Sequence, residues 1–243
     1  MKNSLVNVLG IPFINKDLTE MSALLTKRIN VDKKTFVVTA NPEIVMHAIK
    51  DPIYNEIVNS ADYVVPDGAG VILASRILGT PLKERVAGYD LTIKMLENAN
   101  QNGWKIYLLG GKEDVNSKAV INIKKQYPDI KIAGNHHGFF DMEDDSVARD
   151  ILHAKPDIVL VALGFPRQEI WVSKYFGEFK NGLFIGVGGT IDVLSGNVKR
   201  APSFWVKLNL EWLYRLLIQP SRWRRMLVLP LFVLKVFSSK YKN

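Results

Sequence analysis

The chain has 243 residues, of which 47% are hydrophobic, so it is long enough to bury a sizeable core. It contains no cysteine, which excludes disulfide bonds, thiolate nucleophiles and zinc sites with cysteine ligands. The net charge of +8 is unevenly distributed: residues 1–198 hold 22 Lys and Arg against 23 Asp and Glu, whereas residues 199–243 hold 10 Lys and Arg and one acid, Glu211. The basic character therefore belongs to the C-terminal segment.

Short apolar runs alternate with segments of helical periodicity along residues 1–198. Runs that are nearly continuous in apolar character, as in strands covered on both faces, lie at 35–40, 63–65, 105–110, 130–134, 157–164 and 182–189. Between them, a 3.6-residue period predicts helices at 17–29, 43–59, 69–79, 89–102, 113–126, 143–153 and 167–177. This alternation predicts an α/β fold, a Rossmann-like layered domain with a mostly parallel sheet.

Polar or glycine-rich residues follow five of the predicted strands. Taken singly, each has a structural explanation: Asn41 before Pro42 is a good helix N-cap, and Asp67-Gly68 is a common turn pair. In open α/β sheets, however, ligands bind beyond the carboxyl ends of the strands. We therefore expect one ligand site where these exits meet, at 39–41, 66–68, 110–111, 164–168 and 186–190.

The glycine-rich exits indicate the kind of ligand. The segments LLGGKEDV and GVGGTIDV would let backbone N–H groups and a helix N-terminus approach a phosphate, which favours a phosphorylated or nucleotide ligand. Neither segment matches a P-loop. The segment DGAGVILA weakly resembles a dinucleotide fingerprint, with Asp90 about 20 residues on, but Leu73 stands at the third glycine position. A nicotinamide-dependent oxidoreductase is therefore an alternative.

Asp67 is the candidate general base, because a carboxylate at a rigid strand end can take a proton from an attacking hydroxyl. Partial burial would raise its pKa toward the working pH. The acidic run DMEDD could suggest a metal site, but we interpret it as a helix N-terminus with Asp141 as N-cap. We predict no catalytic metal and no cofactor, and expect cationic side chains such as Arg85 and Arg167 to stabilise a leaving diphosphate.

Residues 199–243 read as a basic, amphipathic appendage. Apolar residues recur at helical spacing over 205–217, the helix is expected to end at Pro220, and a basic cluster (222–225) precedes nine apolar residues at 226–234. This is shorter than the roughly 18–20 apolar residues that span a bilayer. We predict an element that lies on a membrane surface. Packing on the body or on a second copy in a homo-oligomer, and a non-catalytic membrane adaptor, are the alternatives. Nucleic-acid binding is not expected.

Six motifs, in this order and spacing, resemble the bacterial WecG/TagA/CpsF glycosyltransferases: TANPE (39–43), VPDGAGV (65–71), RVAGYDL (85–91), LLGGKEDV (108–115), ALGFPRQEIW (162–171) and FIGVGGTIDVLSG (184–196). The resemblance implies a metal-independent, inverting transferase of glycosyltransferase family 26. The best-known members move N-acetylmannosamine from its UDP form onto undecaprenyl-diphosphate-linked N-acetylglucosamine, which makes the β-1,4 disaccharide of the wall teichoic acid linkage unit. Other members transfer other sugars for other surface polysaccharides.

The resemblance also implies roles for single residues and a location on the cytoplasmic, inner face of the plasma membrane. Asp67 would act as base on the acceptor hydroxyl. Thr39, Asn41 and Gln168 would hold the sugar donor, and Asp192 would meet the ribose or uracil. The remaining expected site residues are Arg85, Gly110, Gly111, Arg167 and Gly188 for the donor, and Arg215, Arg222 and Arg225 for the acceptor diphosphate.

Overall fold

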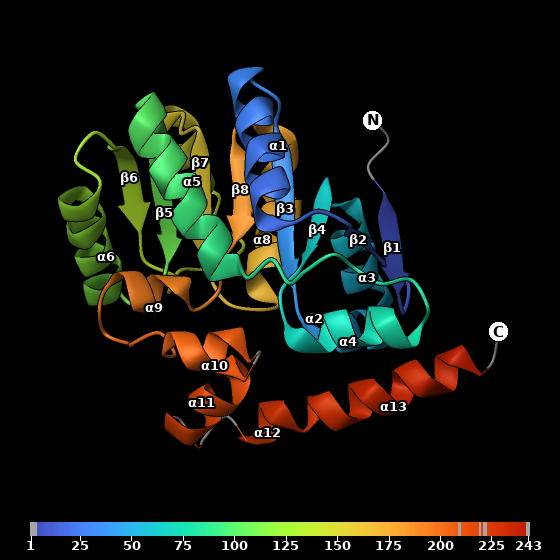
Figure 1. Cartoon of the computed structure of the whole chain (residues 1–243). Coiled ribbons are helices and arrows are strands. Elements are labelled where there is room, and N and C mark those ends of the chain that lie inside the picture. Colours follow the sequence, from blue (N-terminus) through green and yellow to red (C-terminus); the bar gives the residue numbers. More distant parts are fainter. Residues whose placement is uncertain (1–3, 209, 219, 221–222, 242–243) are drawn as a thin grey trace.

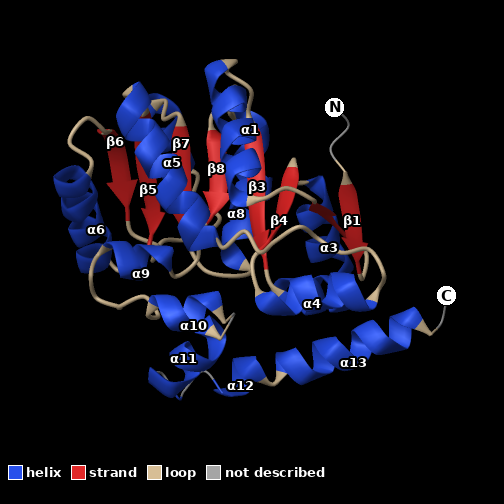
Figure 2. Cartoon of the chain, in the orientation of Figure 1, coloured by secondary structure: helices blue, strands red, loops and turns tan. Residues whose placement is uncertain are grey.

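The computed structural model describes residues 4–208, 210–218, 220 and 223–241. Within these residues an eight-stranded sheet runs in the order β1-β2-β4-β3-β8-β7-β5-β6 (Figures 1 and 2). Only β1 and β2 are antiparallel in it; the other neighbouring pairs are parallel, which confirms the predicted fold class. The strands are β1 (Leu5–Val8), β2 (Ile11–Ile14), β3 (Thr35–Ala40), β4 (Tyr63–Pro66), β5 (Lys105–Gly110), β6 (Lys131–His136), β7 (Ile158–Ala162) and β8 (Leu183–Gly186).

The antiparallel β1–β2 hairpin is the part of the sheet that the sequence did not predict. Its strands have four residues each, too few for a clear alternation of apolar and polar residues. Its two-residue turn is Leu9-Gly10, with positive φ angles of 53° and 92°. Such turns usually carry Asn or Asp before the glycine, and Leu9 gives no such signal.

Helices cover both faces of the sheet. One face carries α1 (Leu18–Asn30), α5 (Gly88–Asn102), α6 (Glu113–Gln126) and the short α9 (Thr190–Leu194), and the other carries α2 (Pro42–Lys50), α3 (Pro52–Ser60), α4 (Ala69–Ile77), α7 (Ser146–Ala154) and α8 (Arg167–Tyr175), with a 3₁₀ turn at Phe176–Glu178. Neighbouring residues of one strand enter opposite cores: Val38 of β3 packs with α2 and α3, and Val37 with α1 and α5. This two-sided burial explains the continuous apolar runs.

The helix predicted over 43–59 is two helices in the structure. Asp51 separates them in an extended conformation (φ −120°, ψ 102°), and its carboxylate accepts a hydrogen bond from the Tyr54 backbone at 3.1 Å. Pro52 disfavours a helical conformation at Asp51, and it fits the first turn of the new helix. The single-helix prediction was therefore wrong at one point, and proline is the reason.

The prediction that Asp141 caps a helix was also wrong. Helix α7 begins at Ser146, with Asp145 in the N-cap position and no side-chain cap. The Asp141 carboxylate instead accepts from the backbone N–H of Glu143 at 3.0 Å, and that of Asp144 accepts from Ser146 at 2.8 Å. Aspartates commonly form such turns two residues ahead, so the acidic run builds the loop before the helix.

The appendage forms α10 (Ser203–Lys207), α11 (Glu211–Ile218), α12 (Trp223–Met226) and α13 (Val228–Lys240), which lie beneath the carboxyl edge of the sheet (Figure 1). The helical stripe predicted over 205–217 is thus divided between α10 and α11. Phe232 and Val236 are at most 1% exposed and bring α13 into the core that also holds α2 and α4. Within the described residues, no helix is both long enough and apolar enough to span a bilayer.

Candidate active site

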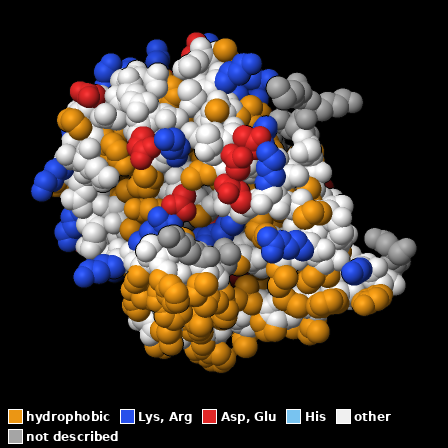
Figure 3. All heavy atoms as spheres, viewed as in Figure 1, with side chains coloured by type: hydrophobic (Ala, Val, Ile, Leu, Met, Phe, Trp, Pro, Cys, Tyr) orange, Lys and Arg blue, Asp and Glu red, His pale blue; other side chains and the backbone are white. Residues whose placement is uncertain are grey.

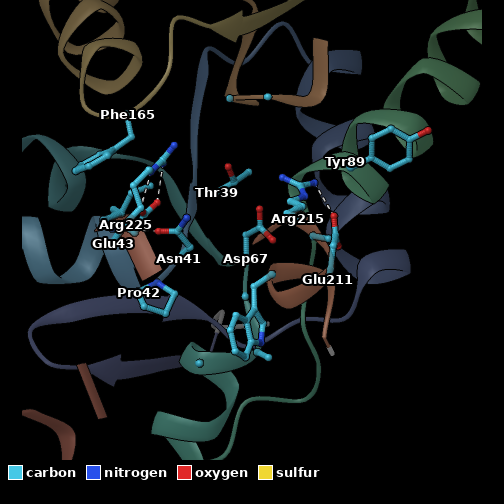
Figure 4. Close-up of a pocket in the computed structure, with 18 of the residues that line it drawn as sticks. Thr39, Asn41, Pro42, Glu43, Asp67, Tyr89, Phe165, Glu211, Arg215 and Arg225 are labelled. Atoms are coloured by element: carbon cyan, nitrogen blue, oxygen red, sulfur yellow. Dashed lines mark hydrogen bonds and ion pairs between the residues drawn. The ribbon is translucent and has the colours of Figure 1, made fainter. Parts of the chain in front are cut away.

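A cavity of about 330 Å³ lies at the carboxyl edge of the sheet, between the strand exits and the appendage (Figure 4). The exits of β3, β4 and β8 and the N-terminus of α8 supply one wall. The other wall comes from α11, α12 and α13. Of the expected site residues, the structure places Thr39, Asn41, Asp67, Arg85, Gln168, Gly188, Arg215 and Arg225 in its lining.

Thr39 and Asn41 are held by contacts at the exit of β3. The Thr39 hydroxyl donates to the carbonyl of Gly186 on β8 at 2.7 Å. The Asn41 side chain caps α2, because its Oδ1 accepts from the Ile44 backbone at 3.1 Å. This confirms the predicted N-cap. It also commits Oδ1 to the helix, so the amide Nδ2 of Asn41 is the group that can donate to a ligand.

Asp67 follows β4 and lies between Asn41 and Arg215 in Figure 4. Its backbone N–H donates to Ala40 at 2.9 Å, and its side chain keeps 30% exposure toward the cavity. The N-terminus of α5 comes so close that a Cβ on Gly88 would lie 3.2 Å from Asp67 Oδ2. Burial raises the pKa of Asp67, and Arg85 and the Gly88 N–H oppose only part of that rise. The carboxylate is therefore a stronger base than an exposed aspartate.

Arg85 connects Asp67 to the appendage. Its Nε lies 3.6 Å from Asp67 Oδ1, and its terminal NH2 donates to Glu211 Oε2 at 2.7 Å. The other carboxylate oxygen of Glu211 accepts from Arg215 at 2.5 Å. Burial alone would raise the pKa of Glu211, but Arg215 and Arg85 together hold it below the usual value. Glu211 is thus an ionised carboxylate enclosed by two guanidinium groups.

A second ion pair joins the appendage to the body. Arg225 donates from Nε and from NH2 to the two carboxylate oxygens of Glu43, at 2.8 and 2.7 Å (Figure 4). Glu43 stands in the first turn of α2, two residues after the capping residue Asn41. Two-point pairing of this kind fixes orientation as well as distance. The appendage is therefore held over the cavity from two sides.

Gln168 is fixed by a neighbour that the sequence analysis did not single out. Its Oε1 accepts from the Gly188 backbone at 3.1 Å, and its Nε2 donates to Glu169 Oε1 at 2.7 Å. Glu169 is 1% exposed, and its Oε2 has no hydrogen-bond partner among the described residues, nor does the Tyr54 hydroxyl. Burial raises the pKa of Glu169 to about 7, although the hydrogen bond from Gln168 opposes this. The carboxyl group is thus held near its titration point at neutral pH.

Replacing Glu169 with glutamine is expected to raise stability at alkaline pH. With a folded-state pKa of about 7 against an ordinary 4.5, the wild type keeps the stabilising effect of this group below pH 4.5 and loses it as the pH rises toward 7, by up to about 3 kcal/mol. Glutamine removes the buried charge and retains an oxygen for Gln168. In thermal melts, the Tm of Glu169→Gln should exceed that of the wild type by up to roughly 10 °C at pH 8 and match it near pH 4. A gain of equal size at both pH values would contradict the assignment.

Several expected site residues lie outside the cavity lining. Gly110 packs against β7, where a Cβ would come within 2.2 Å of the Ala162 carbonyl, so the position admits only glycine. Arg167 donates to the Phe140 carbonyl at 3.4 Å. Arg222 falls outside the described residues. The other two that are absent from the lining are Gly111 and Asp192.

The lining also contains residues that sequence reasoning missed. Among them are the carboxylates Glu211 and Glu43, which pair with arginines across the boundary between body and appendage. Glu211 had a visible signal, because it is the single acid among residues 199–243. Tyr89 and Trp212 add aromatic surface, and nothing in their local sequence pointed to the cavity.

Comparison with known proteins agrees with this architecture. The sequence model of the "Glycosyl transferase WecG/TagA/CpsF family" matches residues 6–243. The chain belongs to this family. It is 44% identical to a Bacillus subtilis (strain 168) protein over 95% of this chain and 90% of that protein. It is 43% identical to a Bacillus spizizenii protein over 92% and 87%, and 39% identical to a Staphylococcus aureus (strain MRSA252) protein over 98% and 94%. All three are named N-acetylglucosaminyldiphosphoundecaprenol N-acetyl-beta-D-mannosaminyltransferase.

The family assignment confirms the resemblance drawn from the six motifs, and with it a glycosyltransferase. The structure also removes one of the sequence features that favoured the oxidoreductase alternative. Asp90, which that interpretation assigned to a ribose, pairs with Arg200, whose two terminal nitrogens each lie 2.7 Å from a carboxylate oxygen. In this chain Asp90 therefore holds the beginning of the appendage to the body.

Proposed function

We propose that the chain transfers N-acetylmannosamine from UDP-N-acetylmannosamine to the 4-hydroxyl of undecaprenyl-diphosphate-linked N-acetylglucosamine, with inversion to a β-1,4 linkage, in wall teichoic acid linkage-unit synthesis. A glycosyltransferase of this family implies a sugar-nucleotide donor and a lipid-linked acceptor. The observation that carries the proposal is the shared name of relatives that are 39–44% identical over nearly the whole chain. Transfer of another UDP-sugar to a lipid-linked acceptor, for another surface polysaccharide, is the alternative.

Asp67 is the base in this proposal. It removes the proton of the acceptor hydroxyl as that oxygen attacks C1 of the donor sugar, and the bond between C1 and the UDP oxygen breaks. The raised pKa and the 30% exposure toward the cavity support this role. Thr39, Asn41 and Gln168 have side-chain groups at the same edge and would hold the donor sugar.

The charge of the leaving diphosphate would be met by side chains of the protein. Arg85, Arg215 and Arg225 all line the cavity. Each guanidinium has five N–H donors, and among the described residues it gives one or two to the carboxylates of the site, so donors remain for phosphate oxygens. Gly110, Gly111, Arg167, Gly188 and Asp192 stay proposals for the nucleotide end of the donor, and the Gly188 N–H is already given to Gln168 Oε1.

The appendage, residues 199–243, would attach the protein to the inner face of the plasma membrane. Large apolar side chains cover its outer surface (Figure 3), among them Phe204, Leu217, Leu231 and Leu234, which are 51–66% exposed. On α13 the buried residues Phe232 and Val236 face the body, while Leu231 and Leu234 lie on the other side. We assign this surface to a membrane rather than a second copy of the chain, because the exposed Lys235 and Lys240 suit anionic lipids.

A transfer assay with a panel of UDP-sugars and a short-chain lipid acceptor tests the function. We expect product from UDP-N-acetylmannosamine, with a rate that is unchanged by EDTA, because arginines and not a metal ion would stabilise the leaving group. Among the described residues, no group of three or more His, Asp or Glu is placed to hold a metal ion. Loss of activity in EDTA and its recovery with Mg²⁺ would reject the metal-free mechanism, and turnover of a different UDP-sugar alone would reject the donor.

A further inference from the structure

Glu211 occupies an unusual position for the single acid of a strongly basic segment. It begins α11, where a carboxylate is favoured by the helix dipole, yet it points into the protein and is only 6% exposed. Each of its two oxygens meets one guanidinium, Arg85 at 2.7 Å and Arg215 at 2.5 Å. A surface acid on a membrane-facing element would serve charge balance equally well without burial. The burial indicates a task inside the cavity.

The contacts of Arg85 show what that task is. Arginine and aspartate side by side commonly form a two-point pair, with two N–H groups on the two carboxylate oxygens. Here Arg85 forms no such pair with Asp67: its Nε stops 3.6 Å from Oδ1 and has no hydrogen-bond partner among the described residues. Its NH2 is taken by Glu211 instead. The guanidinium is thus held short of the carboxylate that would otherwise bind it.

We propose that Glu211 is a positioning residue that restrains Arg85, so that Asp67 keeps a carboxylate free for the acceptor hydroxyl only while the appendage is docked. This inference rests on the proposed function, in which Asp67 is the base. Glu211 belongs to the appendage, and Arg85 and Asp67 belong to the body. The contact that Glu211 makes when the appendage is docked therefore sets how closely Arg85 approaches Asp67.

The charges around Asp67 predict the direction in which its pKa changes when Glu211 or Arg215 loses its charge. The groups that act on its carboxylate are Arg85, the Gly88 N–H, Glu211 and Arg215. Of these, Glu211 raises the pKa of Asp67, and the two arginines and the N–H lower it. Removing the charge of Glu211 leaves two guanidiniums facing one carboxylate, so the pKa of Asp67 falls. Removing the charge of Arg215 has the opposite effect.

The experiment measures kcat/KM against pH for full-length variants, with UDP-N-acetylmannosamine and a short-chain lipid acceptor. For Glu211→Gln we expect the acid limb of the profile to move to lower pH and the plateau to fall by about 10-fold, because a weaker base takes the proton less readily. For Arg215→Gln the acid limb should move to higher pH. Glu43→Gln, which breaks a different ion pair between appendage and body, is the matched control, and its acid limb should stay in place.

Each outcome supports or rejects the role of Glu211 as a positioning residue. If Glu211→Gln and Glu43→Gln lower activity with no displacement of the acid limb, Glu211 is only a clamp and the inference is wrong. If Glu211→Gln does not fold, Glu211→Asp replaces it: the shorter side chain keeps the charge but withdraws it from Arg85, so the acid limb should again move to lower pH, and an acid limb that stays in place would reject the inference. The proposed function fails separately: in that case the wild type transfers no sugar from the UDP donor, or Asp67→Asn retains full turnover.

Discussion

Replacing Asp67 with asparagine is expected to lower kcat by about 10²–10⁴-fold, the range for loss of a general base. Asparagine has nearly the same shape and retains an oxygen for the Gly88 N–H, so the close packing between Asp67 and α5 should survive. What it loses is the ability to accept a proton from the acceptor hydroxyl. UDP affinity should change by no more than about two-fold, because the diphosphate is assigned to arginines and not to this carboxylate.

The measurement pairs a steady-state transfer assay with calorimetric titration of UDP. Asp114→Asn, on the surface of α6, is a suitable control, because it removes a charge from a side chain that is 62% exposed and lies outside the cavity lining. It should leave both quantities unchanged. Full turnover by Asp67→Asn would reject the base assignment, and loss of UDP binding would move Asp67 from catalysis to donor binding.

The location of the cavity could be predicted because parallel strands place their exits on one edge. Thr39 lies near the end of β3, Asp67 and Gly188 follow β4 and β8, and the order β4-β3-β8 brings the three together. Each of these strands is recognisable in the sequence as a buried apolar run. The residue types at the start of a helix also predicted its N-cap, as with Asn41 before Pro42. Both kinds of information are contained within a few residues of sequence.

The electrostatic partners of the site could not be predicted in the same way. Arg85 and Glu211 are 126 positions apart, and Arg225 and Glu43 are 182 apart. Their pairing depends on how the appendage turns back over the sheet, and the predicted continuous stripe over 205–217 would not have placed Glu211 there. Glu169 could not be predicted for a related reason. Its burial and its raised pKa follow from packing against β8 and α3, and not from the residues beside it in the sequence.

The other large expected effect is a loss of membrane binding when the outer face of α13 is changed. Changing Leu231 and Leu234 to aspartate should weaken binding to vesicles that contain anionic lipid by about 10²-fold or more, since a leucine buried in an apolar environment contributes about 1.5–3 kcal/mol. The two side chains are 51% and 66% exposed, so the body loses little packing when they change. Co-sedimentation measures the binding. The matched control is Ile53→Asp with Ile121→Asp, at positions 73% and 64% exposed on α3 and α6.

The same double variant separates membrane attachment from chemistry. Phe232 and Val236 still seat α13 on the body, so Glu211 should continue to reach Arg85 and the active site should remain assembled. Turnover with a water-soluble, short-chain acceptor should therefore match the wild type, whereas turnover with acceptor embedded in vesicles should fall with the loss of binding. Equal pelleting of the variant and the control would remove the membrane role from α13. Loss of turnover on both acceptors would mean that this face is needed to complete the catalytic site, because the residues inside the cavity have not been changed.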